Sequence, residues 1–321
     1  MSEQIQEPLL EVSHLSRYFT AKTRGVAKTV KAVDDVSFSV RRGETFGLVG
    51  ESGCGKTTTG RTILRLYDPT EGSVVFDGRE IAGRMDKSLR KYITSNMSMI
   101  FQDPIASLNP RMTVEEIIAE GLKVRGVNDP QERHRRVVDM LGKVGLLPEF
   151  AARYPHEFSG GQRQRIGIAR ALIVEPQLVI ADEPVSALDV SVQAQVINLL
   201  NELKRTMGLT ILFIAHNLSV VKYFSDRVGV MYFGKLVEMA DCEELFANPV
   251  HPYTRALLSA IPEPDPFKEK NRKKLYYDPA KYRVESDQRP TYHEVAPGHT
   301  VYCTDRELEI FQRELNEEHG R

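Results

Sequence analysis

One segment restricts the fold of this chain more than any other: a glycine-rich turn between an apolar run and a helical pattern. The turn reads Gly50-Glu-Ser-Gly-Cys-Gly-Lys-Thr57, which matches the spacing G-x-x-x-x-G-K-[ST]. The run Glu44–Val49 before it predicts a strand, and Thr57–Leu66 after it predicts a helix. A strand, such a turn and a helix in this order indicate an α/β fold with a phosphate-binding loop. The alternative is a glycine-rich turn that holds a lysine by coincidence, and the flanking elements argue against it.

The residue types of this loop suit a phosphate chain. Glycines let main-chain N–H groups turn toward phosphate oxygens, and the positive end of the following helix faces the same anion. Lys56 is expected to reach the β- and γ-phosphates, and the Thr57 hydroxyl to coordinate Mg²⁺. Cys54 is interpreted as a space-filling residue whose electropositive neighbours lower its thiol pKa. The residues predicted to bind the phosphates are Gly50, Glu51, Ser52, Gly53, Cys54, Gly55, Lys56, Thr57 and Thr58.

A second strand ends in two acidic residues. It reads Leu178-Val-Ile-Ala-Asp182-Glu183, an apolar run followed by Asp and Glu. We expect Asp182 to hold Mg²⁺, directly or through water, and Glu183 to polarise the attacking water, because phosphoryl transfer needs charge neutralisation and an oriented nucleophile. Acidic residues often simply end a strand, so the pair indicates a catalytic site only in combination with the phosphate loop.

Strand-length apolar runs alternate with helical patterns through most of the chain. The further predicted strands are Leu9–Leu15, Val33–Val40, Val74–Phe76, Met97–Phe101, Thr210–Ala215 and a hairpin of Val228–Phe233 with Leu236–Met239. Thr113–Ala171 is mainly helical, and Val192–Lys204 predicts one amphipathic helix. This alternation predicts a mostly parallel sheet covered on both faces, with a separate helical lobe. From Pro262 on, prolines and the basic run Lys268–Lys274 predict a linker or extended tail, with a last charged helix over Asp305–Glu318.

Composition excludes several classes of protein. The net charge is −1, so the chain has no general attraction to nucleic acid or anionic lipid. Its three cysteines, Cys54, Cys242 and Cys303, are far apart and odd in number, which fits a reducing compartment rather than a disulfide framework. The first ten residues lack a signal-peptide pattern, and no apolar run approaches the ~18 residues of a membrane span. We therefore expect a cytoplasmic protein that only other chains could hold at a membrane.

The segment Phe158-Ser-Gly-Gly-Gln-Arg-Gln-Arg165 resembles the signature sequence LSGGQ of ABC ATPases, with Phe158 in place of the leading Leu. Its place after the phosphate loop and before Asp182-Glu183 also matches that superfamily, and the resemblance covers about residues 9–262. It implies a P-loop NTPase (RecA-like) core with an antiparallel β subdomain and an inserted α-helical subdomain at about 103–172. Residues 1–262 would form the nucleotide-binding domain, and residues 263–321 a C-terminal extension.

The resemblance also implies roles for single residues. Gln102 is similar to the Q-loop glutamine, which contacts Mg²⁺ or water and links to the transmembrane partner, and His216 is similar to the H-loop histidine, which contacts the γ-phosphate and helps to position water. Phe19, or alternatively Tyr18, resembles the aromatic residue that stacks on adenine. Asp189 resembles the D-loop acid at the subunit interface. The alternatives are a polar loop residue for Gln102, a structural histidine for His216 and a core aromatic for Phe19.

The signature explains why such a chain should act as a pair. Ser159, Gly160 and Gly161 precede a helix from about Gln162, so their N–H groups and the hydroxyl offer a second anion site. In the superfamily these groups contact ATP held on the phosphate loop of the opposite subunit. ATP then joins two such domains, and its hydrolysis releases them.

Three further stretches resemble the ATP-binding subunits of oligopeptide/dipeptide/nickel importers: Phe101–Met112, Asn248–Thr254 and Val295–Cys303. The alternative is that they are proline-rich turns without a function. The resemblance implies an ATP-hydrolysing subunit at the cytoplasmic face of the membrane, bound to two transmembrane permease subunits. It also implies a second ATP-binding subunit, in a heterodimer rather than a homodimer, and an extracytoplasmic solute-binding protein that takes part indirectly.

Two expectations limit this assignment. Some relatives hold an iron–sulfur cluster near the C-terminus, but Cys303 alone cannot ligate one, so ATP and Mg²⁺ are expected and a cluster is not. The alternative function is a soluble ABC-type ATPase that acts on the ribosome or DNA, although the chain has one phosphate loop, no visible coiled coil and no basic surface. The sequence does not indicate the transported solute.

Overall fold

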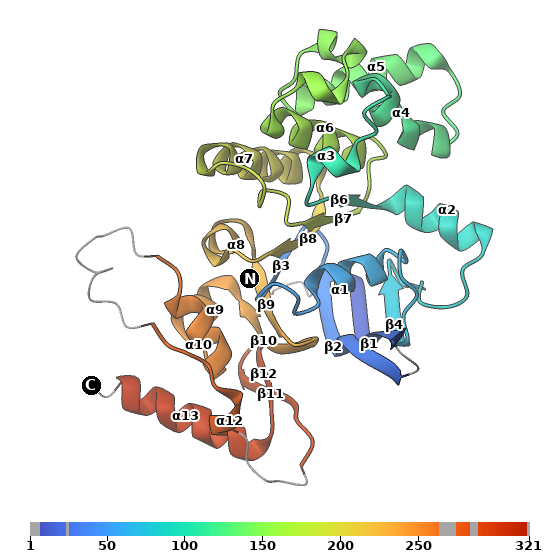
Figure 1. Ribbon diagram of the computed structural model, residues 1–321. Helices are drawn as coiled ribbons and strands as arrows, with labels where there is room; N and C mark the ends of the chain where they lie inside the picture. The colour runs from blue at the N-terminus through green and yellow to red at the C-terminus, as the bar shows by residue number, and fades with distance from the viewer. Residues whose placement is uncertain (1–6, 24–25, 263–273, 283–287, 320–321) are drawn as a thin grey trace.

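In the computed structural model the described residues, 7–23, 26–262, 274–282 and 288–319, form two sheets (Figure 1). One is antiparallel, in the order β2-β1-β4-β5: β1 (Pro8–Thr23), β2 (Val26–Arg41), β4 (Glu71–Phe76) and β5 (Arg79–Glu80). The other has the order β11-β12-β10-β9-β3-β8-β7-β6: β3 (Thr45–Val49), β6 (Met97–Ile100), β7 (Leu178–Asp182), β8 (Thr210–Ala215), β9 (Arg227–Tyr232), β10 (Lys235–Asp241), β11 (Thr291–Ala296) and β12 (His299–Cys303).

The helices in the first half of the chain are α1 (Lys56–Ile63), α2 (Lys87–Asn96), α3 (Pro104–Ser107), α4 (Val114–Val124), α5 (Pro130–Lys143) and α6 (Gly160–Leu172), with the 3₁₀ turns η1 (Pro148–Ala152) and η2 (Pro155–Glu157). Those in the second half are α7 (Val190–Met207), α8 (Leu218–Phe224), α9 (Cys242–Ala247), α10 (Pro252–Ser259), α12 (Pro279–Tyr282) and α13 (Asp305–His319). None of these helices, as far as the chain is described, is long and apolar enough to cross a membrane.

The strands β9, β3, β8, β7 and β6 are parallel neighbours in the larger sheet, with β6 at its edge. Alternate residues of β8 enter two different cores, because successive side chains of a strand point to opposite faces. Leu212 and Ile214 pack in the core that includes Ile63 of α1, whereas Phe213 packs in the core that includes Phe224 of α8. The prediction of a mostly parallel sheet covered on both faces is therefore confirmed.

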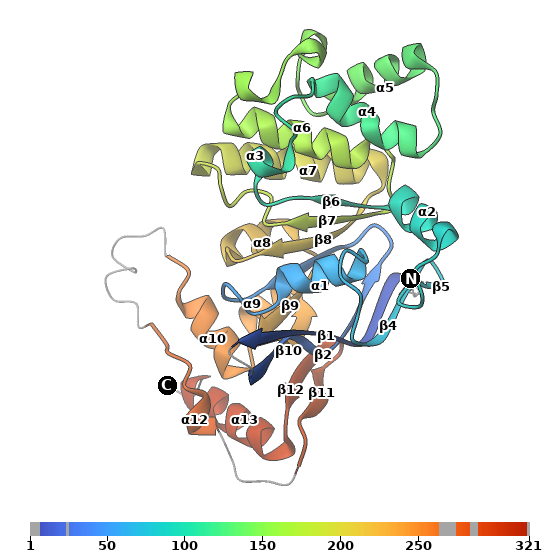
Figure 2. The same cartoon turned by 45° about the vertical axis from the view of Figure 1, so that its right-hand side comes forward.

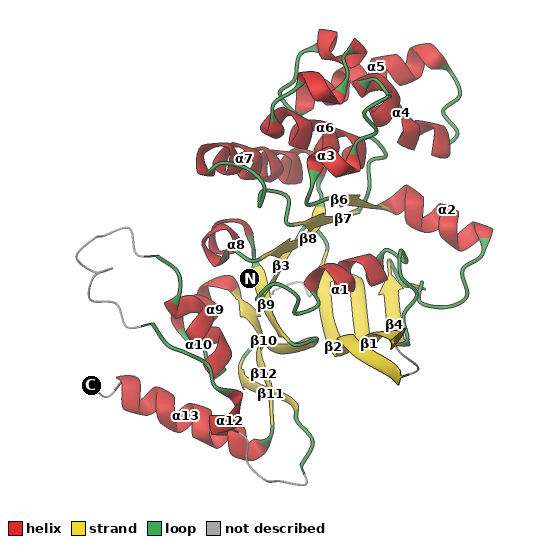
Figure 3. Cartoon of the chain, viewed as in Figure 1, coloured by secondary structure: helices red, strands yellow, loops and turns green. Residues whose placement is uncertain are grey.

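The predicted helical lobe is inserted between β6 and β7. It contains α3 to α6, and its described residues form a helical end of the molecule without strands (Figure 3). Its first long helix begins with a capping box, in which the Thr113 hydroxyl and the Glu116 carboxylate each bond the other residue's main-chain N–H. The C-terminal helices α12 and α13 lie at the opposite end of the molecule (Figure 2).

The first two strands are longer than the sequence predicts. Each spans 16 residues, whereas the apolar pattern covered only Leu9–Leu15 and Val33–Val40. Many of the additional pairs contain polar, exposed residues, such as Thr20 opposite Thr29, although Phe19 opposite Val30 is apolar. Main-chain pairing holds this part of the hairpin together without burying side chains, so hydrophobic alternation could not reveal it.

The described part of the C-terminal extension is more ordered than a linker or extended tail. The hairpin of β11 and β12 joins the larger sheet, because Val301 and Thr300 pair with Glu238 and Met239 of β10. The predicted last helix is confirmed as α13. Most of the predicted linker and all but Lys274 of the basic run lie outside the described residues.

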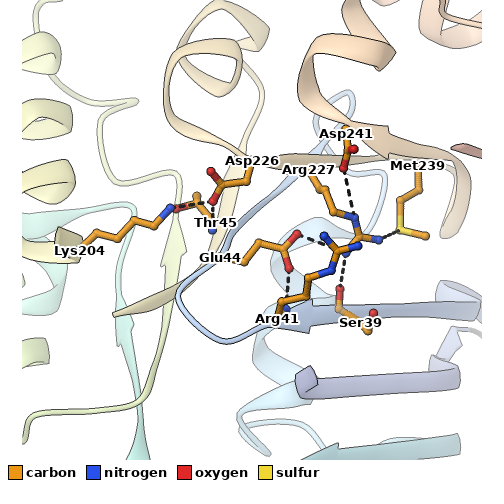
Figure 4. A network of polar contacts seen from close by, with 9 residues as sticks. All are labelled: Ser39, Arg41, Glu44, Thr45, Lys204, Asp226, Arg227, Met239 and Asp241. Carbon is orange, nitrogen blue, oxygen red and sulfur yellow. Dashed lines mark hydrogen bonds and ion pairs between the residues drawn. The ribbon is translucent and has the colours of Figure 1, made fainter. Parts of the chain in front are cut away.

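A buried polar network connects the two sheets near the start of β3 (Figure 4). Arg227 of β9 and Glu44 are 3.2 Å apart, with side chains that are 9% and 5% exposed. Arg227 also donates to the carbonyl of Ser39 on β2, and Glu44 accepts from the N–H of Arg41. Close by, Asp226 accepts from the N–H of Thr45 and from Lys204 of α7 (Figure 4). This network fixes β3, the strand that carries the phosphate loop, against its neighbours.

Candidate active site

A cavity of about 370 Å³ lies at one edge of the parallel sheet. Strands β3, β6, β7 and β8 are parallel, so the residues that follow their carboxyl ends meet at this edge. The cavity is lined by Ala32, Ser52, Gly53, Gly55, Lys56, Thr57, Thr58, Gln102, Glu183 and His216. The structure thus brings together residues predicted from four separate segments.

The loop after β3 can adopt its path only with glycine at key positions. Gly50 has a φ of 147°, and a Cβ there would lie 2.2 Å from the Met231 carbonyl oxygen. Gly55 has a φ of 112°, and a Cβ there would lie 2.1 Å from the Ala32 carbonyl oxygen. Gly55 is also the N-cap of α1 and offers no side-chain hydrogen bond, so the first N–H groups of α1 remain available to an anion at the cavity.

Lys56 is buried with its ammonium group inside the loop. Its Nζ donates to the carbonyls of Gly50 at 2.7 Å and Glu51 at 2.9 Å, and its exposed fraction is 4%. The predicted lowering of the Cys54 pKa is wrong. Burial raises the pKa of this thiol above its ordinary value, and the nearby Lys56 charge lowers it by less. The space-filling interpretation of Cys54 fits its 6% exposure.

Asp182 and Thr57 form the second part of the site. Thr57 Oγ1 donates to Asp182 Oδ1 at 2.7 Å, and burial raises the pKa of Asp182. Within the described part of the chain, Asp182 Oδ2 has no hydrogen-bond partner; the nearest cation is Arg61, at 3.9 Å. A buried carboxylate oxygen without a donor is costly, and beside a hydroxyl it suits the oxygen-ligand preference of Mg²⁺. These residues therefore fit the metal.

Arg61 is a residue that the sequence interpretation missed. It follows Thr57 by four positions on α1, and residues four apart share a helix face, so Thr57 and Arg61 both turn toward Asp182. This spacing was visible in the sequence and could have identified Arg61. Ala32 of β2, which lines the cavity, carried no such signal.

Glu183 lies between Gln102 and His216. Its Oε2 accepts from Gln102 Nε2 at 3.0 Å and is 3.0 Å from His216 Nδ1. The Glu183 side chain is 13% exposed, whereas that of His216 is 54% exposed. The N–H of Glu183 donates to the Ile214 carbonyl, which holds the end of β7 against β8. Two predicted catalytic side chains, those of Gln102 and His216, thus contact the same carboxylate oxygen of a third, Glu183, at the cavity wall.

The remaining predicted residues are not part of this cavity. Ser159, Gly160, Gly161 and Gln162 begin α6, where Ser159 and Gln162 form a capping box. Asp189 is the exposed N-cap residue of α7.

The predicted adenine-stacking residue also lies outside the cavity lining. The Phe19 ring packs edge-on against Tyr67 at 5.4 Å and lies under the Arg17 guanidinium at 4.6 Å. Its neighbour Tyr18 donates to Asp34 at 2.6 Å instead. Within the described residues no group of three or more His, Cys, Asp or Glu side chains is arranged to hold a metal ion, and the prediction about an iron–sulfur cluster stays a prediction.

Comparisons with known proteins identify the family of this chain. A family model described as ABC transporter matches residues 33–186, and one described as oligopeptide/dipeptide transporter, C-terminal region, matches residues 237–283. The chain is 59% identical to the oligopeptide transport ATP-binding protein OppF of Bacillus subtilis over 308 residues, 95% of this chain and 99% of that protein. It is 50% identical to the dipeptide transport ATP-binding protein DppF of Lactococcus lactis, over 95% of this chain and 97% of that one.

A solved structure of a dimeric ATP-binding cassette, MJ0796 bound to ADP and Pi, matches with a TM-score of 0.65 and 28% identity, over 73% of this chain and 98% of that one. A parallel sheet with this phosphate loop, acidic strand end and inserted helical lobe defines an ABC-type ATPase, and the chain belongs to this class. Within it, the chain belongs to the oligopeptide/dipeptide transporter family of ATP-binding subunits. It binds and hydrolyses ATP as a subunit of an ABC transporter.

Proposed function

We propose that this chain powers the uptake of oligopeptides or dipeptides across the membrane by hydrolysing ATP at the cavity described above. The observation that carries the proposal is the convergence of Gln102 and His216 on Glu183 beside the Asp182–Thr57 pair. The peptide cargo is supported by the relatives, which are oligopeptide and dipeptide transport proteins by name.

The residues of the cavity divide the work of phosphoryl transfer. Main-chain N–H groups of the loop and Lys56 bind the phosphates of ATP. Thr57 and Asp182, with Gln102 beside them, would hold Mg²⁺, which neutralises phosphate charge when bound. Glu183 accepts a proton from, or polarises, the attacking water, and its contact with His216 keeps the carboxylate oriented.

A second ATP-binding subunit completes the site. The exposed N-terminus of α6, with Ser159, Gly160, Gly161 and Gln162, lies outside the cavity, and a partner's ATP is its proposed ligand. Asp189 contributes to the same interface, and Phe19 stacks on adenine. We favour a heterodimer, since the importer family often uses two different ATPase chains.

The proposed complex is peripheral at the cytoplasmic face of the membrane. Two permease subunits hold the pair of ATPases there, and an extracytoplasmic solute-binding protein delivers the peptide. Nucleic acid has no part in this function, and neither does an iron–sulfur cluster. We assign residues 1–262 to the nucleotide-binding domain and residues 263–321 to the C-terminal extension.

Uptake of a labelled tripeptide tests the proposal. Cells that lack this chain should lose uptake, and the wild-type chain should restore it while Glu183→Gln should not. The native complex purified from membranes should contain two permease chains and a distinct second ATP-binding chain. Unchanged uptake of every peptide tested, or sedimentation of the chain with ribosomes, would contradict the proposal.

A further inference from the structure

The C-terminal region, by which we mean α10 and the described elements after it, contacts the phosphate loop through a hydroxyl group. Tyr253 of α10 is 2% exposed, and its Oη accepts a hydrogen bond from the main-chain N–H of Glu51 at 3.1 Å. Glu51 is the second residue of the phosphate loop, so a residue from the far end of the nucleotide-binding domain reaches the ATP site. Burial raises the pKa of Tyr253, so the hydroxyl stays protonated at neutral pH.

This contact holds one peptide group of the loop from both sides. The N–H of the Gly50–Glu51 peptide donates to Tyr253, and its C=O accepts from Lys56 Nζ at 2.7 Å. The N–H and C=O of a trans peptide point in opposite directions, so the two bonds together fix the rotation of the peptide plane. The next carbonyl, that of Glu51, also accepts from Lys56. Tyr253 therefore helps to position the main-chain carbonyls that accept hydrogen bonds from Lys56.

The position of the Tyr253 hydroxyl is itself set by packing. The Tyr253 ring lies 4.4 Å from the Tyr232 ring and 5.7 Å from the Tyr277 ring, measured between centroids. Its main-chain N–H donates to Nδ1 of His251, the N-cap residue of α10. Tyr277 comes from the segment that precedes α12, so the described part of the C-terminal extension takes part in holding the ring.

The start of α10 is fastened to the larger sheet by one buried carboxylate. Glu238 of β10 is fully buried and accepts from the N–H groups of Val250 at 2.7 Å and His251 at 3.1 Å. A third contact joins Glu238 to Nε2 of His299 on β12 at 2.8 Å. Two stretches that the sequence singled out, Asn248–Thr254 and Val295–Cys303, thus meet at the same residue.

The last helix adds a second attachment. Arg255 of α10 and Glu314 of α13 form an ion pair at 2.7 Å, and Lys281 of α12 contacts the same carboxylate at 2.6 Å. Helices α10, α12 and α13 lie side by side in both views (Figures 1 and 2). The helix that carries Tyr253 is therefore held along its length by elements of the C-terminal extension.

We propose that Tyr253 is a positioning residue for ATP: through its bond to Glu51, the C-terminal region pre-organises the phosphate loop. The hydroxyl acts on the loop and not on the reacting atoms. Its loss should weaken ATP binding and leave the chemical step nearly unchanged. This role gives the C-terminal region a part in nucleotide binding in addition to its place in the fold.

The test compares Tyr253→Phe with Tyr282→Phe in the full-length chain. Tyr282 also uses its hydroxyl inside the C-terminal region, where it donates to Glu314, but it does not contact the phosphate loop. Because one hydrogen bond contributes about 0.5–1.5 kcal/mol, Tyr253→Phe should weaken Mg-ATP binding by about 2- to 12-fold and should raise KM by the same factor. The value of kcat should change by less than about 2-fold. Hydrogen exchange at the Glu51 amide should be faster in Tyr253→Phe only.

Three results would overturn the proposal. The first is wild-type ATP affinity together with wild-type exchange at Glu51 in Tyr253→Phe. The second is an equal loss of affinity in Tyr282→Phe, which would mean that any damage to the C-terminal region has this effect. The third is a loss confined to kcat with KM unchanged. Melting of both variants, followed by circular dichroism, shows that each is folded at the assay temperature.

Discussion

Replacing Glu183 by Gln removes a charge from the cavity while keeping the shape of the side chain. In the structure, Glu183 Oε2 is within 3.0 Å of both Gln102 and His216, and the side chain is only 13% exposed. The amide of glutamine can still bond to these neighbours. It cannot take a proton from the attacking water, so the variant lacks the general base but keeps the shape and contacts of the side chain.

The size of the effect follows from this role. Loss of a general base typically costs about 10²- to 10⁴-fold in rate. At about 1.36 kcal/mol per tenfold, this is about 3 to 5 kcal/mol of lost transition-state stabilisation. Because the phosphate loop is untouched, ATP affinity should stay close to the wild-type value, and ATP should accumulate on a closed pair of subunits.

Steady-state phosphate release and size-exclusion chromatography with Mg-ATP measure both consequences. Glu115→Gln is the matched control, because Glu115 is also 3.0 Å from a histidine, His134, but lies in the helical lobe away from the cavity. We expect wild-type hydrolysis for this control. Hydrolysis within about 3-fold of wild type in Glu183→Gln would refute the base assignment, since the predicted loss is at least about 100-fold.

Three other outcomes are expected. Alkylation of Cys54 should inhibit ATP hydrolysis, and bound ATP should protect the thiol. The alkylation itself should be slow below pH 9, because burial raises the pKa of Cys54. Full activity after confirmed modification would contradict this prediction. Although burial alone would lower the pKa of His299, Glu238 and Glu244 raise it overall, so the stability it contributes is fully present below about pH 6.5 and is lost as pH rises through the raised pKa. In urea unfolding, His299→Asn should therefore lose more stability relative to the wild type at pH 6 than at pH 9. An equal loss at both pH values would refute this prediction. Arg227→Met should cost about 3–5 kcal/mol in urea unfolding by stranding the buried Glu44 charge, and Glu44→Gln in the same chain should recover part of this; a cost below about 1 kcal/mol would contradict it.

The sequence predicted the site best where chemistry dictates residue order. The loop from Gly50 to Thr57, the acids after β7 and His216 after β8 are each tied to the end of a strand. Parallel strands bring those ends to one edge, so motif and topology together imply proximity. The central strands could also be predicted from the sequence, because strands that are buried throughout, such as Thr210–Ala215, appear as continuous apolar runs.

Other features depend on contacts that no local pattern records. The outer part of the first hairpin is largely polar and lacks regular hydrophobic alternation, and the hairpin of β11 and β12 joins the sheet by pairing with β10, far away in sequence. The bond from Glu51 to Tyr253 also joins two distant segments. The prediction of a lowered Cys54 pKa failed because the direction of the shift depends on whether the effect of burial or that of the Lys56 charge is larger. Only the structure shows how deeply the thiol is buried.

Calorimetric titration of the purified chain with ATP, with and without Mg²⁺, is the most direct measurement. We expect magnesium-dependent binding at one site per chain. Lys56→Ala should weaken it by about 10- to 100-fold, as expected for the loss of a charged hydrogen-bond donor to phosphate. A folded wild-type chain that shows no magnesium-dependent affinity for ATP would contradict both the site and the function built on it.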